Sequence, residues 1–297
     1  AAHRDMYLDP DGDIVEGMSL YSRAASGVPG SVDGLLKALA DYGSGNINRR
    51  QALAPAIRLA EKGFILSHYE ATRLNHNKDL FKQNEAAAEI FVRKDGRSWQ
   101  AGDRLLQADL ARTLKRISKH GRDGFYRGHV ADLIVAEMKR GNGFISHEDL
   151  KNYSSVYRTP VTGSFHEYGI LSMGPPSSGG ALLVNMMNML ENYTLDTLGW
   201  NSSDYVHLLT EIERRAYADR AEHFGDPEYW AVPMKMLTSK TYAASRTGDI
   251  SMNKATPSSA VSASEPFGYE SRETTHYSVV DKEGNAVSVT TTINLSY

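Results

Sequence analysis

The chain has 297 residues, of which 41% are hydrophobic, so it can bury the core of one large domain or of two ordinary ones, and a collagen-like or disordered protein is excluded. Its 33 basic and 36 acidic residues leave a net charge of -3, which excludes the electrostatic footprint of a protein that binds nucleic acid or an anionic membrane. Because it has no cysteine, disulfides, a thiolate nucleophile and a zinc-thiolate site are also excluded.

The first half of the chain predicts helices, several of which stop at a glycine. Apolar residues recur at helical spacing over 31–43, 53–63 and 106–121, and again over 130–138 and 205–218. Ser31 is the expected cap of the first of these helices, and the first three close at a glycine. The longest apolar run, 181–190, is interrupted by two asparagines, which favours a buried helix over a membrane span. The glycines of Pro175–Gly180 are not followed by lysine, so we interpret this segment as a turn before that helix rather than a phosphate loop.

Strand-like residues concentrate towards the end of the chain. β-Branched and aromatic residues predict strands at 90–92, at 160–172 and from Thr275 onward. Because helices are predicted in the first half of the chain and strands towards its end, the sequence indicates an α+β fold class. The segment 255–273 begins with a run rich in serine and alanine, and we expect it to be a mobile tether. A start without methionine and an end just after strand-like residues lead us to expect that the chain is a piece of a longer protein.

The last strands predict a β-hairpin. Residues 275–281 and 286–292 flank Lys282–Asn285, where Gly284 can supply the positive φ of a short loop. A three-residue loop pairs Thr274 with Thr292, whereas a four-residue loop pairs Thr275 with Thr292. Either register brings Thr292 beside Thr274, and Asn294 then lies just beyond.

Thr274 would become a minimal catalyst if the chain were cut before it. The cut would give one residue both a hydroxyl nucleophile and an α-amine, whose unperturbed pKa of about 7.7 to 8.0 suits it to act as the base. Threonine is also a common strand residue, so the residues by themselves favour an ordinary structural role for Thr274 and for Thr290–Thr292.

A family resemblance changes that balance. The segment Thr274–Asp281, with Gly284–Val287 after it, closely resembles the start of the small subunit of γ-glutamyltranspeptidases. Five further stretches resemble that family's large subunit in the same order: Ser26–Ser31, Leu59–Phe64, Phe125–Gly128, Pro175–Gly180 and Ala216–Arg220. The resemblance therefore covers nearly the whole chain.

The resemblance implies an N-terminal-nucleophile hydrolase fold, a four-layer αββα sandwich with a helix-rich first half, made as an inactive precursor. Residues 1–273 would belong to the large subunit and 274–297 would begin the small subunit, together as part of one domain. The precursor would cut itself between Glu273 and Thr274. Thr274 would then take the γ-glutamyl group of a donor such as glutathione as an ester and pass it to water or to an amino acid or peptide acceptor.

By the same resemblance, Thr292 would position or activate Thr274, and Asn294 would bind the donor's α-amino or α-carboxylate group. The family's carboxylate-binding arginine would lie before Ala1 and its oxyanion glycines after Tyr297, so we expect this piece to need the remainder of the small subunit. No cofactor is expected. We expect no metal either, because the ten histidines show no zinc-site spacing. Similar bacterial enzymes imply a periplasmic or secreted location.

Two alternatives stay open. A cephalosporin acylase of the same superfamily would share the nucleophile strand but cleave a glutaryl side chain, and an inactive relative would serve as a binding or assembly subunit.

Other polar residues are interpreted as structural or solvated rather than catalytic. We interpret His276 as structural, and Asp219 with His223 as a solvated helix pair. Arg214, Arg215 and Arg220 are interpreted as a solvated helix face.

Overall fold

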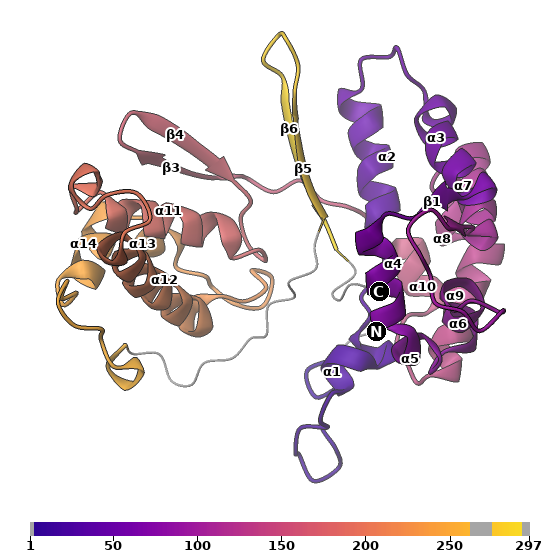
Figure 1. Ribbon diagram of the computed structural model, residues 1–297, viewed down its shortest axis with the longest axis horizontal. Helices are drawn as coiled ribbons and strands as arrows, with labels where there is room; N and C mark the ends of the chain where they lie inside the picture. Colours follow the sequence, from indigo (N-terminus) through magenta and orange to yellow (C-terminus); the bar gives the residue numbers. More distant parts are fainter. Residues whose placement is uncertain (1–2, 262–274, 293–297) are drawn as a thin grey trace. The chain divides into compact units, whose positions relative to one another are not determined.

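The computed structural model describes residues 3–261 and 275–292, and its contacts divide the chain into two compact units, Ala1–Val156 and Tyr157–Tyr297 (Figure 1). This boundary differs from the predicted division at the Glu273–Thr274 junction. Because that junction lies outside the described residues, the division into large-subunit and small-subunit portions stays a prediction.

The first unit is almost entirely helical. Its elements are α1 (Met18–Tyr21), α2 (Ser31–Tyr42), α3 (Arg49–Lys62), β1 (Phe64–Ile65), α4 (His68–His76), α5 (Lys78–Phe81), α6 (Glu85–Phe91), β2 (Arg104–Leu105), α7 (Ala108–His120), α8 (Asp123–Tyr126), α9 (His129–Arg140) and α10 (His147–Asn152). Helices α3 and α7 lie side by side, and β1 pairs with β2 in an antiparallel sheet (Figure 1). One buried cluster centres on Tyr126 and Leu150, and a second on Leu66 and Phe81.

The second unit is built around helix α11. Its elements are β3 (Val161–Phe165), β4 (Tyr168–Ser172), α11 (Gly179–Leu190), α12 (Ser203–His223), α13 (Met234–Leu237), α14 (Lys240–Thr247), β5 (Thr275–Val280) and β6 (Ala286–Thr291). Helix α11 contacts α12, α14 and the β3–β4 hairpin. Met189, Leu208 and Ala243 are completely buried where these helices meet, which explains the apolar run predicted as a buried helix.

Most of the predicted elements are confirmed. The helices expected over 31–43, 53–63, 106–121, 130–138, 181–190 and 205–218 correspond to α2, α3, α7, α9, α11 and α12, and 160–172 forms the β3–β4 hairpin. In the described residues the strands form three two-stranded sheets, so the α+β class is confirmed. No helix within 3–261 or 275–292 is long and apolar enough to cross a membrane.

Two local predictions were wrong. Residues 90–92 are not a strand, because Asn84 accepts a hydrogen bond from the Ala87 amide and begins helix α6, which runs to Phe91. The alanines that follow this cap favour the helix over the local β propensity. Ser31 is not the cap of α2 but its first residue, since Gly30 occupies the cap position and no side chain caps the helix there.

Candidate active site

The β5–β6 hairpin has the three-residue-loop register. Thr275 pairs with Thr291, and the ladder continues without a bulge to Val280 and Ala286. The loop forms because the Asp281 carboxylate accepts hydrogen bonds from the amides of Glu283 and Asn285, at 3.0 and 2.8 Å. Gly284 adopts the positive φ of 84° that the sequence predicts for it. The register that would pair Thr275 with Thr292 is therefore excluded.

One face of this hairpin is polar. His276 Nδ1 lies 2.7 Å from Thr290 Oγ1, and its Nε2 lies 3.1 Å from Ser288 Oγ and 3.3 Å from Ser278 Oγ. Because side chains alternate between the faces of a strand, Thr275, Tyr277 and Thr291 belong to the opposite face. His276 thus holds the two strands together on the even-numbered side of β5, which agrees with its structural interpretation.

The predicted site residues are only partly within the described chain. Thr292 follows the last residue of β6 directly and is exposed. Glu273, Thr274 and Asn294 lie outside the described residues, so their roles stay predictions. The described part of the site is the pair of strands next to these residues: β5 begins directly after Thr274, and β6 ends directly before Thr292.

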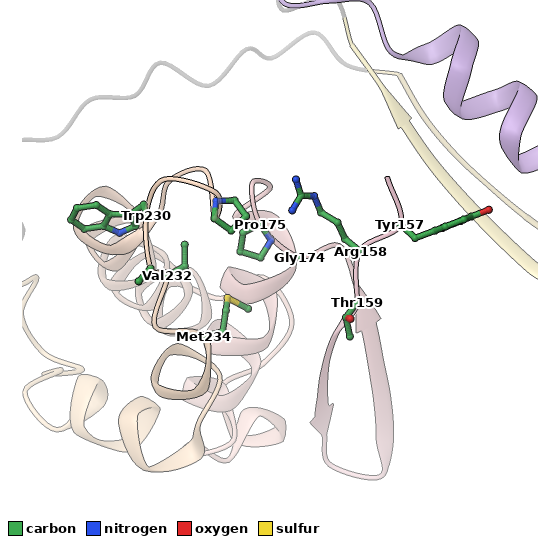
Figure 2. A pocket seen from close by; sticks show the side chains of 10 residues that line it. Tyr157, Arg158, Thr159, Gly174, Pro175, Trp230, Val232 and Met234 are labelled. Atoms are coloured by element: carbon green, nitrogen blue, oxygen red, sulfur yellow. The ribbon is translucent and has the colours of Figure 1, made fainter. Parts of the chain in front are cut away.

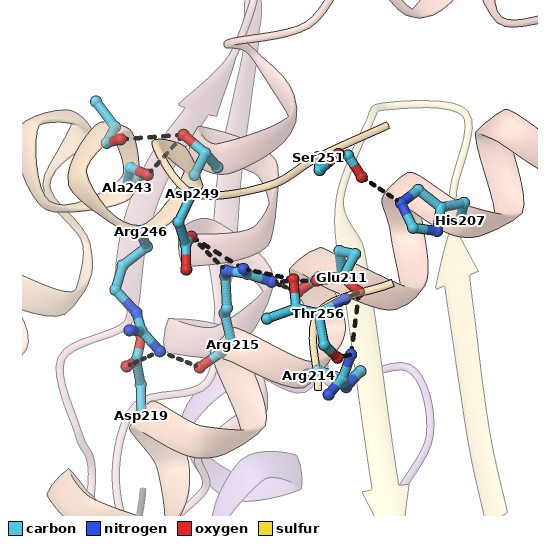
Figure 3. Close-up of polar contacts among 12 residues, drawn as sticks. His207, Glu211, Arg214, Arg215, Asp219, Ala243, Arg246, Asp249, Ser251 and Thr256 are labelled. Carbon is cyan, nitrogen blue, oxygen red and sulfur yellow. Dashed lines mark hydrogen bonds and ion pairs between the residues drawn. The ribbon is translucent and has the colours of Figure 1, made fainter. Parts of the chain in front are cut away.

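A second polar cluster, which sequence reasoning missed, lies on α12 (Figure 3). Arg215 is 1% exposed, and its guanidinium donates to the Glu211 carboxylate at 2.6 Å and to Asp249 at 2.9 Å. Glu211, also 1% exposed, accepts a hydrogen bond from the Thr256 amide at 2.9 Å. Burial by itself raises the pKa of Glu211, but hydrogen bonds from Thr256 and Arg215 outweigh it and lower the pKa to about 2. Glu211 is therefore ionised at neutral pH.

Asp219 lies on the same helix and is also buried. Its carboxylate accepts hydrogen bonds from Tyr242 at 2.9 Å and Asn185 at 3.1 Å, and it forms an ion pair with Arg246 at 3.0 Å. Burial and the hydrogen bond to Asp219 raise the pKa of Tyr242 to about 12. The interpretations of Asp219 and Arg215 as solvated residues were therefore wrong. The sequence did contain a signal for this burial, because the charged residues share the helical spacing of apolar ones. The residues that recur at the spacing of one buried helix face are Leu208, Glu211, Ile212, Arg215 and Asp219.

Arg220, the third arginine of the predicted solvated face, bonds Ser178 through its Nε at 2.9 Å. Ser178 is the cap residue of α11, which starts at Gly179, within the segment predicted as a turn over Pro175–Gly180. The interpretation of that segment as a turn before a helix is confirmed, with the helix starting two residues earlier than predicted. Arg220 therefore ties α12 to the start of α11.

An open cavity of about 500 Å³ lies elsewhere in the second unit (Figure 2). Its lining includes Arg158, Pro175, Trp230 and Met234, and Arg158 is paired with Glu228 at 3.4 Å. Thr292, the predicted site residue that the structure describes, is not among the residues that line it. In the part of the chain that is described, no three histidine, aspartate or glutamate side chains converge as a metal site requires.

Comparison with known proteins assigns the chain's relatives. The family model described as Gamma-glutamyltranspeptidase matches residues 1–297. The chain is 43% identical to a glutathione hydrolase proenzyme of Escherichia coli (strain K12) over 297 residues, which are 100% of this chain and 51% of the relative. It is 38% identical over 283 residues to an acylase ACY 1 proenzyme of Pseudomonas sp. (strain SE83), covering 95% of this chain and 49% of the relative.

Solved structures agree with these sequence matches. The crystal structure of Helicobacter pylori gamma-glutamyltranspeptidase superposes with a TM-score of 0.82 at 40% identity, covering 87% of this chain and 73% of that one. A gamma-glutamyltranspeptidase from Pseudomonas nitroreducens, solved with L-DON, gives a TM-score of 0.80 at 33% identity, covering 88% and 76%. The chain spans about half the length of the curated relatives it matches.

Proposed function

The chain belongs to the gamma-glutamyltranspeptidase family, and on that premise we propose that it is part of a self-cleaving N-terminal-nucleophile hydrolase. In this proposal the precursor is cut between Glu273 and Thr274. The Thr274 hydroxyl attacks the Glu273 carbonyl, the peptide nitrogen leaves as an amine, and water hydrolyses the resulting ester. The products are a large subunit that ends at Glu273 and a small subunit that begins with Thr274.

The register of the β5–β6 hairpin is the observation that supports this site. Pairing descends from Val280 with Ala286 to Thr275 with Thr291. One further step of the same register predicts Thr274 opposite Thr292, with their Cβ atoms about 4.5 to 5.5 Å apart. Both residues would then share the polar face of His276, where the Thr292 hydroxyl can position the nucleophile.

The proposed reaction of the mature enzyme is acyl transfer. The α-amine of Thr274 accepts the proton of the Thr274 hydroxyl, which attacks the γ-glutamyl amide of a donor such as glutathione. The leaving amine takes that proton, and the γ-glutamyl group then passes from the Thr274 ester to water or to an amino acid or peptide, which frees the Thr274 hydroxyl. Asn294 would bind the donor's α-amino or α-carboxylate group, and the remainder of the small subunit would complete the pocket. A periplasmic or secreted location belongs to the same proposal.

Intact-mass measurement of the full-length protein tests the cleavage. We expect wild type to split before Thr274 and Thr274→Ala to stay whole. Thr292→Ala should lower the rate of γ-glutamyl transfer on the order of 10²-fold, as loss of one preorganised hydrogen-bonding group at a reacting centre does. Thr291→Ala is the matched control, because it removes the same hydroxyl from the opposite face of β6. A wild-type precursor that never splits would refute the proposal and favour an inactive relative.

An acylase is the second candidate, because an acylase proenzyme is 38% identical to this chain. Competition between a γ-glutamyl and a glutaryl amide separates the two functions, since only the first carries an α-amine for the site to bind. A higher kcat/KM for the glutaryl amide would replace the transpeptidase assignment with that of a glutaryl acylase.

A further inference from the structure

The polar cluster on α12 holds a chain segment that contains neither α-helix nor strand. This segment, residues 249–258, follows α14 and ends at the first residue of a short 3-10 helix, Ser258–Ala260, and α12 contacts it at successive turns. His207 Nε2 lies 2.8 Å from the Ser251 carbonyl oxygen, and one turn further on Glu211 accepts from the Thr256 amide. Arg214 then donates to the Thr256 carbonyl at 2.7 Å (Figure 3). It also donates to the Ser258 hydroxyl at 3.2 Å.

The groups that hold this segment are unusual in their burial. Glu211 and Arg215 are each 1% exposed, and they lie beside the apolar core residues Leu208 and Ile212. A buried ion pair adds little net stability over apolar side chains of similar volume, but it strongly favours the one arrangement that satisfies both charges. Here that arrangement includes the Thr256 amide and hydroxyl, so the cluster selects the position of the segment.

The segment also lies just upstream of the proposed cut in the sequence. Ser258 precedes Glu273 in the chain, and residues 255–273 were predicted as the tether. The structure shows the beginning of that tether, at Thr256 and Ser258, bound to α12. Residues 262–273 lie outside the described chain.

We propose that Glu211, Arg214 and Arg215 form an anchor that holds residues 249–258 on α12 and so positions the chain upstream of the Glu273–Thr274 bond for self-cleavage. The inference rests on the proposed function. These three are positioning residues, because they act through the segment and do not touch the reacting atoms. The anchor shortens the stretch of chain between the last residue held on the second unit and the start of β5, the two ends that must be brought together for cleavage.

The size of the effect follows from that span. Without the anchor the chain runs from Thr247, the end of α14, to Thr275, the start of β5, which is 28 residues. With the anchor it runs from Ser258 to Thr275, which is 17 residues. The probability of loop closure falls as the 3/2 power of length, so loss of the anchor should slow placement of the junction about twofold.

The test uses the full-length precursor with Arg214→Gln, which removes the donors to Thr256 and Ser258. Arg158→Gln is the matched control, because it also removes a partly exposed arginine and its ion pair within the second unit, away from the segment. Trypsin cleavage after the exposed Lys254 reports release of the segment independently of activity. We expect Arg214→Gln to speed this cleavage about fivefold or more, as loss of one or two hydrogen bonds does to a local opening equilibrium. The control should match wild type.

Pulse-chase labelling then measures the half-time of self-cleavage. We expect it to lengthen about twofold in the double variant Glu211→Ala/Arg214→Gln, which loses the main contacts to both Thr256 and Ser258. It should lengthen less in Arg214→Gln alone, where Glu211 and Arg215 still hold Thr256, and should stay at the wild-type value in the control. Arg214→Lys, which keeps the charge and one donor, should recover part of the rate. An insertion of about 11 glycine and serine residues after Val261 should give the same twofold delay with every anchor contact intact, so it tests the inference even if Arg214→Gln does not fold.

The outcomes separate the two claims. A wild-type precursor that stays whole overturns the proposed function together with the role of the anchor in cleavage. If wild type splits, and both the double variant and the insertion variant split at the wild-type rate, the proposed function stands and the anchor's role in cleavage is overturned. Unchanged trypsin cleavage after Lys254 overturns the anchoring itself.

Discussion

Replacing Glu211 by glutamine should remove a defined, pH-dependent part of the protein's stability. The pKa of Glu211 falls from 4.5 to about 2 on folding. Because the native state binds this proton less readily than the unfolded state, the stabilisation is complete above about pH 4.5 and is lost as the pH falls towards about 2. A shift of this size corresponds to about 3 kcal/mol in total, of which about 1 kcal/mol is lost by about pH 3.5.

Comparing wild type with Glu211→Gln at neutral pH and at about pH 3.5 measures this pH-dependent stabilisation. At neutral pH, Glu211→Gln leaves Arg215 buried with only Asp249 as a charged partner, so the free energy of unfolding should fall by about 3 to 5 kcal/mol. At about pH 3.5 the difference between wild type and variant should shrink by about 1 kcal/mol, because the wild type alone has lost that contribution.

Urea unfolding of the full-length protein at both pH values, followed by circular dichroism, gives the required free energies. Glu213→Gln is the matched control, because Glu213 lies on the same helix but is exposed. If wild type and Glu211→Gln lose stability in parallel between the two pH values, the ionised, hydrogen-bonded state assigned to Glu211 is wrong.

Two further substitutions test the packing of the two units, each measured by urea unfolding beside its control. Leu208→Ala empties a completely buried position on α12 and should cost about 2 to 5 kcal/mol, whereas Leu171→Ala, at a side chain 78% exposed, should change stability by less than about 0.5 kcal/mol. Gly124→Ala would push a Cβ into the backbone carbonyl of Arg116 and should cost about 1 to 3 kcal/mol, while Gly27→Ala meets no atom within 4 Å. Equal losses in a variant and its control would contradict the packing described.

The hairpin shows how much local sequence can determine. Its strands and its turn were predicted from β propensity and from Gly284, and both are confirmed. The sequence did not predict which of the two registers forms, because both loop lengths suit a glycine at that position. The Asp281 carboxylate decides it by bonding two amides of the loop, and this geometry appears only once the turn has formed.

Helix α12 shows the opposite case. Its periodicity predicted the helix, but charged residues on it were assigned to solvent. Arg215 and Asp219 are buried because segments from elsewhere in the chain cover them: Asp249 and Thr256 bond the first, and Asn185 and Tyr242 the second. A helix pattern shows which residues share a face, but it does not show what will cover that face.

The amino-acid sequence by itself determined the positions of the principal helices, the hairpin that leads to the proposed nucleophile, and the family to which the chain belongs. These depend on spacing, turn chemistry and motif order, which neighbouring residues carry. Only the tertiary structure decided that Glu211 and Arg215 are buried and that α12 holds residues 249–258. Those facts depend on contacts between residues more than 30 positions apart, such as Arg215 with Asp249, and such contacts exist only after the chain has folded.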